Sequence, residues 1–482
     1  MDKKVVFSNL LWRFAERISA QLVSFIVSII LARMLDPIAY GTVALITVFT
    51  MILQVFVDSG LGNALIQKKD ADNVDFSTVF FTNIVFCTIL YIFLFVASPT
   101  IAEFYGDTTL IAYTRVLGLT VFISGIKNVQ QAYVSRNMLF KCFFFSTFGG
   151  TVVAGVIGVI MAYAGFGVWA LVAQQVINLA IDTSILWITV KWRPDFVFSY
   201  ERLMGLFSFG WKLLVSSLLD TVYNNIRQLL IGKIYTSSDL AFYNQGDKFP
   251  KLVVANINTS IDSVLLSAMS KEQDSKERVK NMTRRSIKIS TYIMAPLMMG
   301  LAFCGHSIIG LLLTDKWLPC VSFMRIFCVS YIFWPILTAN LNAIKAMGRS
   351  DLFLKLEVCK KVVGILALLV TMLISVKAVA LSLLFTTVIS QFINAAPNKK
   401  LLDYGYAEQF KDILPAICLS IVMGIIIYPI QYLGFSYFVT LLIQVPLGAI
   451  IYVAGSKLLH LDSFEYLLGI VKPNLKKLKR GK

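Results

Sequence analysis

Apolar runs of about twenty residues recur along the whole chain, and they constrain its fold more than any other feature. A run of this length crosses the roughly 30 Å hydrocarbon core of a bilayer as one α-helix. The runs are continuously apolar and do not alternate with period two, so helices are expected rather than a transmembrane barrel. Only 15% of the 482 residues are charged, too few to cover a soluble fold. We therefore predict an all-α polytopic membrane protein.

The runs predict about fourteen transmembrane helices. Only Ala164 and Gly165 separate the fifth run from the sixth, which predicts a tight hairpin there. Lys377 interrupts the apolar stretch of the eleventh and twelfth runs, so it either ends one helix or lies inside a longer one. The predicted spans are residues 10–32, 40–66, 76–98, 109–131, 143–163, 166–190, 206–231, 249–269, 289–313, 321–343, 359–375, 378–396, 412–430 and 435–455.

The distribution of basic residues predicts the orientation in the membrane. Loops on the cytoplasmic side of membrane proteins carry an excess of Lys and Arg. If both termini are cytoplasmic, most of the 44 Lys and Arg fall in predicted cytoplasmic loops or their flanks, including the charged stretch 270–288, a predicted amphipathic extension. The formal net charge of +17 then reflects membrane orientation and indicates no nucleic-acid partner.

The segments outside the spans are short, which argues against a soluble catalytic domain and against an enzyme. Residues 457–482 form a polybasic cytoplasmic tail, which we expect to lie against anionic lipid headgroups. The seven cysteines form no CxxC motif and no cluster with histidine, so no metal site, disulfide or cofactor is predicted. The basic residues of the last part of the tail are Lys472, Lys476, Lys477, Lys479, Arg480 and Lys482.

A weak internal repeat has a period near 200 residues. Phe7-Ser8 with Trp12 recurs as Phe207-Ser208 with Trp211, and 31–33 with 39–40 recurs as 231–233 with 241–242. Parallel repeats of this kind divide transporters into two pseudo-symmetric halves. We predict two six-helix lobes, an N-lobe (1–200) and a C-lobe (201–405), followed by two extra helices (406–456) and the tail (457–482).

Several short motifs resemble one family of membrane transporters. The chain is similar to the polysaccharide-transport branch of the multidrug/oligosaccharidyl-lipid/polysaccharide exporter superfamily, which contains the repeat-unit flippases for lipopolysaccharide and exopolysaccharide. The motifs cover residues 31 to 351 in the expected order and are specific as a set, whereas the last 130 residues match only in hydropathy. The motifs are Leu31-Ala32-Arg33, Tyr40-Gly41, Asp58-Ser59-Gly60-Leu61-Gly62-Asn63-Ala64-Leu65-Ile66-Gln67, Gly165-Phe166-Gly167-Val168-Trp169-Ala170-Leu171, Lys191-Trp192-Arg193-Pro194, Phe207-Ser208-Phe209-Gly210, Lys316-Trp317-Leu318-Pro319 and Gly348-Arg349-Ser350-Asp351.

This resemblance implies a central cavity between two six-helix lobes and transport by alternating access. The implied substrate is an undecaprenyl-diphosphate-linked oligosaccharide, moved from the cytoplasmic to the outer leaflet of the bacterial inner membrane. The polysaccharide polymerase machinery is an implied partner. No cofactor is expected, and a proton or sodium gradient is the candidate for energy coupling.

Basic residues within the spans are the candidate ligands for a diphosphate. A guanidinium can bind phosphate through two parallel hydrogen bonds, so Arg17, Arg115 and Arg227 are the leading candidates, with Lys127 beside them. All four lie within about two helical turns of a predicted span end. Long basic side chains at such positions also reach the headgroups without any functional role, and this alternative stays open.

Acidic residues within the spans are the candidates for ion coupling. An ionisable group in a span costs roughly 2.5–3.5 kcal/mol on insertion scales and therefore tends to face a cavity or a partner. Coupling requires a carboxylate that is alternately paired and solvated, whereas a fixed interhelical ion pair is the structural alternative. The candidates are Glu16, Asp58, Asp182, Asp220 and Asp262.

Two other functions are alternatives to the flippase. A cation-coupled multidrug antiporter of the same superfamily is the first, although drug exporters usually have twelve spans. A membrane-embedded polysaccharide polymerase or ligase is the second, but it would need a large outer loop with catalytic residues. The predicted outer loops are short, so the flippase is favoured.

Overall fold

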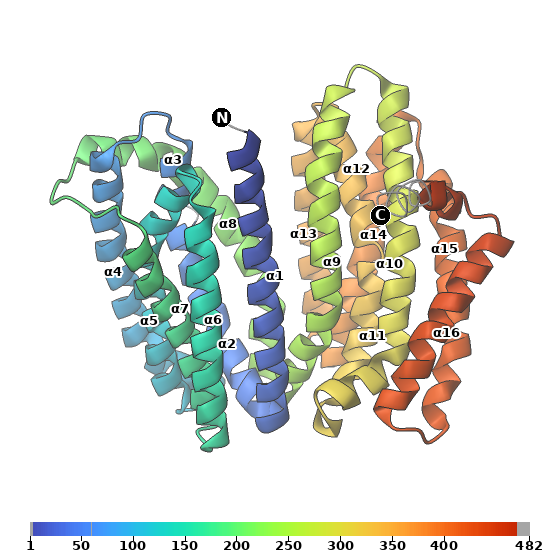
Figure 1. The fold of residues 1–482 in the computed structure, drawn as a ribbon, viewed down its shortest axis with the longest axis horizontal. Coiled ribbons are helices and arrows are strands. Elements are labelled where there is room, and N and C mark those ends of the chain that lie inside the picture. Colours follow the sequence, from blue (N-terminus) through green and yellow to red (C-terminus); the bar gives the residue numbers. More distant parts are fainter. Residues whose placement is uncertain (1–2, 59, 470–482) are drawn as a thin grey trace, which may run out of the picture. The chain divides into compact units, whose positions relative to one another are not determined.

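The computed structural model describes residues 3–58 and 60–469, and these residues form helices without any strand (Figure 1). The predicted all-α class is confirmed. The α-helices are α1 (Lys3–Met34), α2 (Pro37–Asp58), α3 (Leu61–Gln67), α4 (Asn73–Tyr105), α5 (Leu110–Arg136), α6 (Phe140–Tyr163), α7 (Val168–Thr189), α8 (Tyr200–Ile234), α9 (Ser237–Lys271), α10 (Lys276–Leu312), α11 (Cys320–Tyr331), α12 (Trp334–Ala346), α13 (Ser350–Thr371), α14 (Val376–Leu402), α15 (Tyr406–Ile427) and α16 (Tyr437–Leu458), with short 3₁₀ turns η1 (Asp315–Trp317) and η2 (Tyr428–Tyr432).

Twelve segments of the described chain are long and apolar enough to cross a membrane, and α8, bent by 49° between Ser208 and Gly210, makes a thirteenth. Each of the fourteen predicted spans overlaps a helix, but the count of fourteen is not confirmed. The difference lies in α13, whose first half carries Lys355, Glu357, Lys360 and Lys361. Its remaining apolar part, ending at Thr371, is shorter than a full span.

The break between α13 and α14 resolves the ambiguity at Lys377. The helix α13 ends at Thr371 and α14 begins at Val376, so Lys377 lies in the first turn of α14. The hydroxyl of Ser375 accepts a hydrogen bond from the Ala378 amide over 3.1 Å, which caps the new helix. The hairpin predicted at Ala164-Gly165 is also present between α6 and α7, and Gly165 adopts the positive φ of 82° that this turn requires.

The chain divides into two compact units, residues 1–241 and 242–482. In the first unit, α8 packs against α2, α3 and α4, while α1, α6 and α7 pack side by side. In the second unit, α10 packs against α11, α12, α15 and α16, and α14 packs against α11, α12 and α13. The predicted limits of the lobes, the two extra helices and the tail stay predictions, and residues 470–482 of the tail lie outside the described part.

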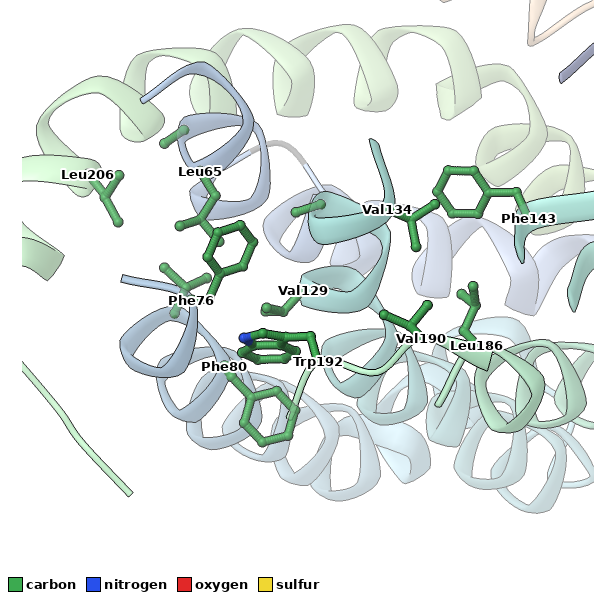
Figure 2. Packing of buried hydrophobic residues seen from close by; sticks show 13 residues of the cluster. Leu65, Phe76, Phe80, Val129, Val134, Phe143, Leu186, Val190, Trp192 and Leu206 are labelled. Carbon is green, nitrogen blue, oxygen red and sulfur yellow. The ribbon is translucent and has the colours of Figure 1, made fainter. Parts of the chain in front are cut away.

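A cluster of buried hydrophobic residues surrounds Trp192 in the first unit (Figure 2). Trp192, from the connection between α7 and α8, packs its ring 5.8 Å from Phe76 and 6.1 Å from Tyr133. Its indole nitrogen donates a hydrogen bond of 2.6 Å to the Asn73 side chain at the start of α4. A buried Trp with a paired N–H fixes a connection firmly, so this motif residue holds α4, α5 and the α7–α8 connection together.

Buried amides join three helices of the second unit. Asn340 of α12 and Gln409 of α15 exchange two hydrogen bonds of 2.9 Å. Asn398 of α14 donates to Asn340 over 2.7 Å, and Gln391 of the same helix donates to Gln409 over 3.1 Å. In a membrane the hydrophobic effect does not drive helices together, so interhelical hydrogen bonds between amides help to specify which helices pair.

The segment predicted as an amphipathic extension, 270–288, is largely helical. It contains the end of α9 and the first turns of α10. Arg284 binds Asp412 of α15 through two hydrogen bonds of 2.7 and 2.9 Å, and Lys288 lies 3.3 Å from the same carboxylate. These contacts dock the charged end of α10 on α15.

The short turn between α1 and α2 lies against the short turn between α8 and α9, and a glycine permits the contact. The α1–α2 hairpin brings Gly41 against the beginning of α9, where a Cβ atom on Gly41 would lie 1.7 Å from the Ser237 carbonyl oxygen. A Cβ on Gly232 would likewise lie 2.3 Å from the Leu45 side chain. The motif residue Gly41 is therefore required for a close backbone approach.

Replacing Gly41 by Ala should force this backbone contact apart and lower the free energy of unfolding by about 1–3 kcal/mol, the usual range for overpacking. The melting temperature of the purified protein in detergent measures the effect. Gly300→Ala in α10 is the matched control, because a Cβ there meets open space and Ala favours the helix. Equal melting temperatures for the two variants would contradict the close contact.

Candidate functional site

Polar side chains that are exposed within a membrane-spanning helix mark the candidate site. Such groups are costly against lipid and therefore face water, a ligand or other polar groups. In α1, Arg17, Gln21 and Ser24 are exposed at helical spacing, next to exposed apolar side chains of the same helix. In α8, Ser216, Asp220 and Asn224 form a second exposed polar stripe. Exposed apolar residues flank the two stripes and include Phe14, Ile18, Leu22, Val215 and Leu219.

The helix α9, which belongs almost entirely to the second unit, shows the pattern most clearly. Asn256, Thr259 and Asp262 are exposed, and we call them the α9 polar stripe. Val264 is the one large apolar side chain exposed on α9 among those that the structure describes. The second half of α13 shows the opposite pattern, since every side chain exposed there is apolar, as on a lipid-facing helix: Val362, Ile365, Leu366, Leu369 and Val370.

A buried ion pair lies in the interior of the first unit. Lys127 of α5 and Asp182 of α7 are 2.5 Å apart, and both side chains are largely buried. Asp58, exposed at the end of α2, accepts hydrogen bonds from Gln54 over 3.2 Å and from Asn128 over 3.3 Å. It also interacts electrostatically with Lys127. The structure thus brings three predicted site residues, Asp58, Lys127 and Asp182, into one polar cluster.

The other candidates lie apart from this cluster and from one another. Buried Glu16 pairs with Arg13 over 2.6 Å, whereas its neighbour Arg17 is exposed. Arg115 donates to Ser98 over 3.0 Å and lies 4.0 Å from the Phe95 ring, so α4 holds it in place.

Arg227 and the two remaining acids complete the set of candidates. Arg227 is buried on α8 with its guanidinium 5.9 Å from the Tyr223 ring, and its Nε has no hydrogen-bond partner among the described residues. Asp220 belongs to the α8 stripe, and Asp262 belongs to the α9 polar stripe. Of the four predicted cations, only Arg17 is exposed within a span.

A carboxylate in the first third of α9 is not among the residues predicted from the sequence. Tyr331 of α11 donates a short hydrogen bond to Asp247, and Lys251 lies 3.6 Å from the same carboxyl group. The span was predicted from residue 249, but α9 begins at Ser237. The sequence signal for this earlier helix start is the pair Thr236 and Asp239, whose side chains and amides form reciprocal capping hydrogen bonds of 3.1 and 3.2 Å.

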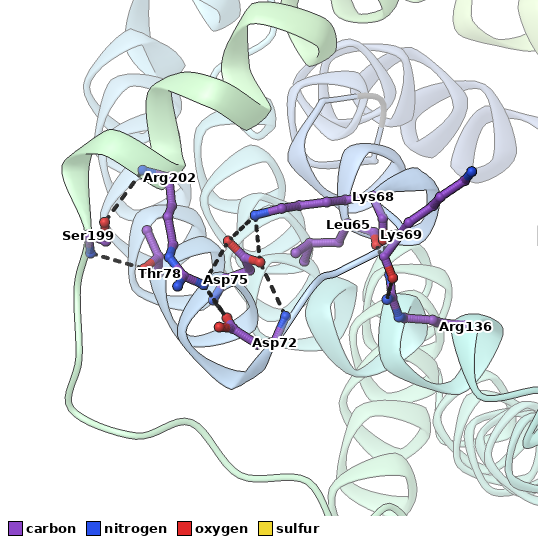
Figure 3. A network of polar contacts seen from close by, with 9 residues as sticks. All are labelled: Leu65, Lys68, Lys69, Asp72, Asp75, Thr78, Arg136, Ser199 and Arg202. Atoms are coloured by element: carbon purple, nitrogen blue, oxygen red, sulfur yellow. Dashed lines mark hydrogen bonds and ion pairs between the residues drawn. The ribbon is translucent and has the colours of Figure 1, made fainter.

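A charged network at one end of the first unit ties α8 to the connection between α3 and α4 (Figure 3). Arg202 of α8 forms a short ion pair with Asp72 and lies 3.5 Å from Asp75. Lys68 binds the buried Asp75 over 2.7 Å, and Arg136 donates to backbone carbonyls including that of Leu65. The Arg202 side chain lowers the pKa of Asp72 below its ordinary value of 3.8. Arg202, Lys68 and Arg136 each already have a protein partner, so their contacts form a structural clamp rather than an anion site.

Comparison with known families gives one match to most of the chain. The model of a family described as "polysaccharide biosynthesis protein" matches residues 30–322. The teichuronic acid biosynthesis protein TuaB of Bacillus subtilis is 28% identical over 63% of this chain and 63% of its own length. The succinoglycan biosynthesis transport protein ExoT of Rhizobium meliloti is 23% identical over 66% and 64%. The lipopolysaccharide biosynthesis protein WzxC of Escherichia coli is 20% identical over 83% of both chains. The chain spans less than two thirds of the length of the first two relatives.

Solved structures share the fold. The lipid II flippase MurJ in an inward closed conformation superimposes with a TM-score of 0.74, at 14% identity over 94% of this chain and 99% of that chain. An inward-facing multidrug resistance MATE family transporter of the MOP superfamily gives 0.63, at 13% identity over 81% and 98%. At these identities the likeness establishes the fold.

Removing one member of the Lys127–Asp182 pair should leave a buried charge without its partner and cost on the order of 3–5 kcal/mol. Lys127→Met and Asp182→Leu should each lower the melting temperature in detergent. The double variant carries no buried charge and should recover most of the loss. A double variant as unstable as the sum of both single variants would contradict a direct pair.

The ion pair between Arg202 and Asp72 should stabilise the protein less at acidic pH. Because the folded-state pKa of Asp72 is depressed, the stabilisation from its pair with Arg202 is complete above the ordinary value of 3.8 and is lost as the pH falls through the lower value. Asp72→Asn should therefore melt earlier than the wild type at pH 7, and the difference should shrink below pH 3.8. Asp70→Asn in the same exposed loop is the control, and an equal effect there would point to general loop charge.

Proposed function

We propose that this chain, which belongs to the polysaccharide biosynthesis protein family, is a flippase for lipid-linked oligosaccharides. The family predicted from the motifs between residues 31 and 351 is thereby confirmed. The proposed substrate is an undecaprenyl-diphosphate-linked repeat unit of a cell-surface polysaccharide, moved from the cytoplasmic to the outer leaflet. Relatives named for teichuronic acid, succinoglycan and lipopolysaccharide, and a fold shared with a lipid II flippase, support it.

The observation that carries the proposal is the exposed polar stripes within membrane-spanning helices. A lipid-linked oligosaccharide is polar at one end and apolar at the other. Its headgroup needs a polar path through the bilayer, and Arg17, Asp220 and Asp262 each lie on such a stripe. A polymerase or ligase would instead need a catalytic loop outside the membrane. A drug antiporter shares the fold, but the named relatives act in polysaccharide biosynthesis.

The diphosphate is assigned to Arg17. A guanidinium on an exposed polar stripe can form two charge-assisted hydrogen bonds to a phosphate. Lys127 is held by Asp182, and Arg115 by Ser98 and the Phe95 ring. Substrate contact by Lys127, Arg115 and the buried Arg227 stays a prediction, because it requires rearrangement in another state of the transport cycle.

Energy coupling is assigned to the cluster of Asp58, Lys127 and Asp182. Asp58 is exposed and within electrostatic reach of a Lys that a second carboxylate already neutralises. Binding of a proton or sodium ion to one carboxylate would release the Lys toward the other. Coupling roles for Glu16 and Asp220 stay predictions.

The setting follows from the same proposal. The chain is a multi-pass membrane protein, and we propose the bacterial cytoplasmic membrane with both termini in the cytoplasm. The polybasic tail would contact anionic lipids, and the polysaccharide polymerase machinery would receive the product in the outer leaflet.

Arg17→Ala should reduce transport by about 10- to 100-fold, the range expected for losing a charged hydrogen bond of 1.5–3 kcal/mol. Arg17→Lys should restore it only in part, because an ammonium cannot form the two parallel bonds. The measurement is the surface-labelled pool of lipid-linked repeat unit in cells that depend on the variant, at equal protein level.

Arg278→Ala is the matched control for charge, because this exposed Arg pairs with Glu272 at the junction of α9 and α10. It should leave the labelled pool unchanged. Wild-type labelling in Arg17→Ala would refute the diphosphate role of Arg17. Wild-type labelling in cells that lack the whole protein would refute the proposed function.

A further inference from the structure

We propose that the α9 polar stripe, formed by Asn256, Thr259 and Asp262, binds hydroxyl groups of the transported oligosaccharide. The inference rests on the proposed flippase function and adds to it the residues that recognise the sugar. In this proposal two sites bind the two parts of the headgroup. Arg17 binds the diphosphate, and the α9 polar stripe binds the sugar hydroxyls.

The position of the stripe supports contact with a ligand rather than with lipid. All three side chains are exposed on a helix that is long and apolar enough to span the membrane. An exposed carboxylate in such a span is costly unless water or a polar ligand surrounds it. From residue 256 to residue 262 the helix rises by about 9 Å, so the stripe can contact more than one sugar ring.

The chemistry of the three side chains matches sugar hydroxyls. Thr259 donates its hydroxyl hydrogen to the Ala255 carbonyl over 2.8 Å, which leaves the oxygen lone pairs to accept a hydrogen bond. Asp262 as a carboxylate accepts hydrogen bonds and would repel a diphosphate. A ligand at this stripe must therefore supply hydroxyl or amino hydrogens, as a carbohydrate does.

Asp262 is oriented by a buried residue of the same unit. Asn342 of α12 is fully buried and donates a hydrogen bond of 2.9 Å to Asp262 Oδ1. The second carboxylate oxygen, Oδ2, has no partner within the part of the chain that the structure describes. One oxygen is thus fixed and the other can accept from a ligand, which is how polar groups in a binding site set the orientation of a substrate. Asn342 is accordingly a positioning residue.

Ion coupling is the alternative role for Asp262. The coupling cluster of the first unit contains a basic partner, which a carboxylate needs for alternating between paired and solvated states. Asp262 forms no ion pair with any described residue, and its polar neighbours on the stripe are an amide and a hydroxyl. This composition favours a polyol over a coupling ion.

The test compares two defined lipids bound to the full-length protein in nanodiscs, measured by thermophoresis. One lipid is undecaprenyl diphosphate, and the other is the lipid-linked oligosaccharide that accumulates in cells lacking the protein. Asp262→Asn should weaken binding of the oligosaccharide lipid by about 10- to 100-fold and change binding of undecaprenyl diphosphate by less than about twofold. Asn342→Leu should give a smaller loss with the same selectivity.

Asp274→Asn, an exposed carboxylate between α9 and α10, is the matched control and should change neither affinity. The melting temperature of each variant shows whether it is folded, and Asn342→Leu tests the same contact from its buried side. Equal weakening of both lipids, or unchanged binding of both, in a folded Asp262→Asn would overturn the inference. A variant with normal affinities but altered dependence of transport on pH or sodium would overturn it in favour of coupling. A wild type that binds neither lipid would refute the proposed function instead.

Discussion

The hydrocarbon core of the bilayer does not solvate polar groups, and every other feature of this protein depends on that constraint. It requires the chain to be helical, and it requires each polar side chain within a span to have a partner or to face water. Lys127 and Asp182 satisfy the requirement by pairing, and Arg115 does so with Ser98 and Phe95. Arg17 and Asp262 are exposed instead. The same physical rule therefore separates structural charges from those available to a substrate.

The rule also explains what the sequence could predict. Hydropathy locates nearly every span, because burial in lipid acts on each helix separately. It does not count α13 correctly, because the charges from Lys355 to Lys361 occupy a helix whose apolar part is too short. Similarly, hydropathy assigns the polar stretch around Thr236 to a loop, although a helix begins there with a side-chain cap.

Pairing between helices could not be predicted in the same way. Lys127 and Asp182 are 55 residues apart and come from helices whose rotation about their axes is set by packing, not by local sequence. The sequence separates the nine charged candidates by chemistry, with basic groups for a diphosphate and carboxylates for ion coupling, but it does not show which of them are buried. Burial distinguishes them: Glu16 is buried and Arg17, its direct neighbour, is exposed. The family motifs gave a different kind of information, because Gly41 and Trp192 act through close approach and packing rather than through contact with a ligand.

The charges on the exposed stripes suggest how a flippase can bind an amphiphile tightly enough to move it and loosely enough to release it. A site that used only cations would hold the diphosphate strongly in every state and bind any polyprenyl diphosphate. A carboxylate such as Asp262 adds nothing to the affinity for the diphosphate and disfavours its presence nearby. It gives affinity only when a hydroxyl-bearing group replaces the water at its free oxygen. Selectivity for the glycosylated carrier over the polyprenyl diphosphate alone then follows from the negative charge of Asp262. It does not require higher affinity for the lipid part.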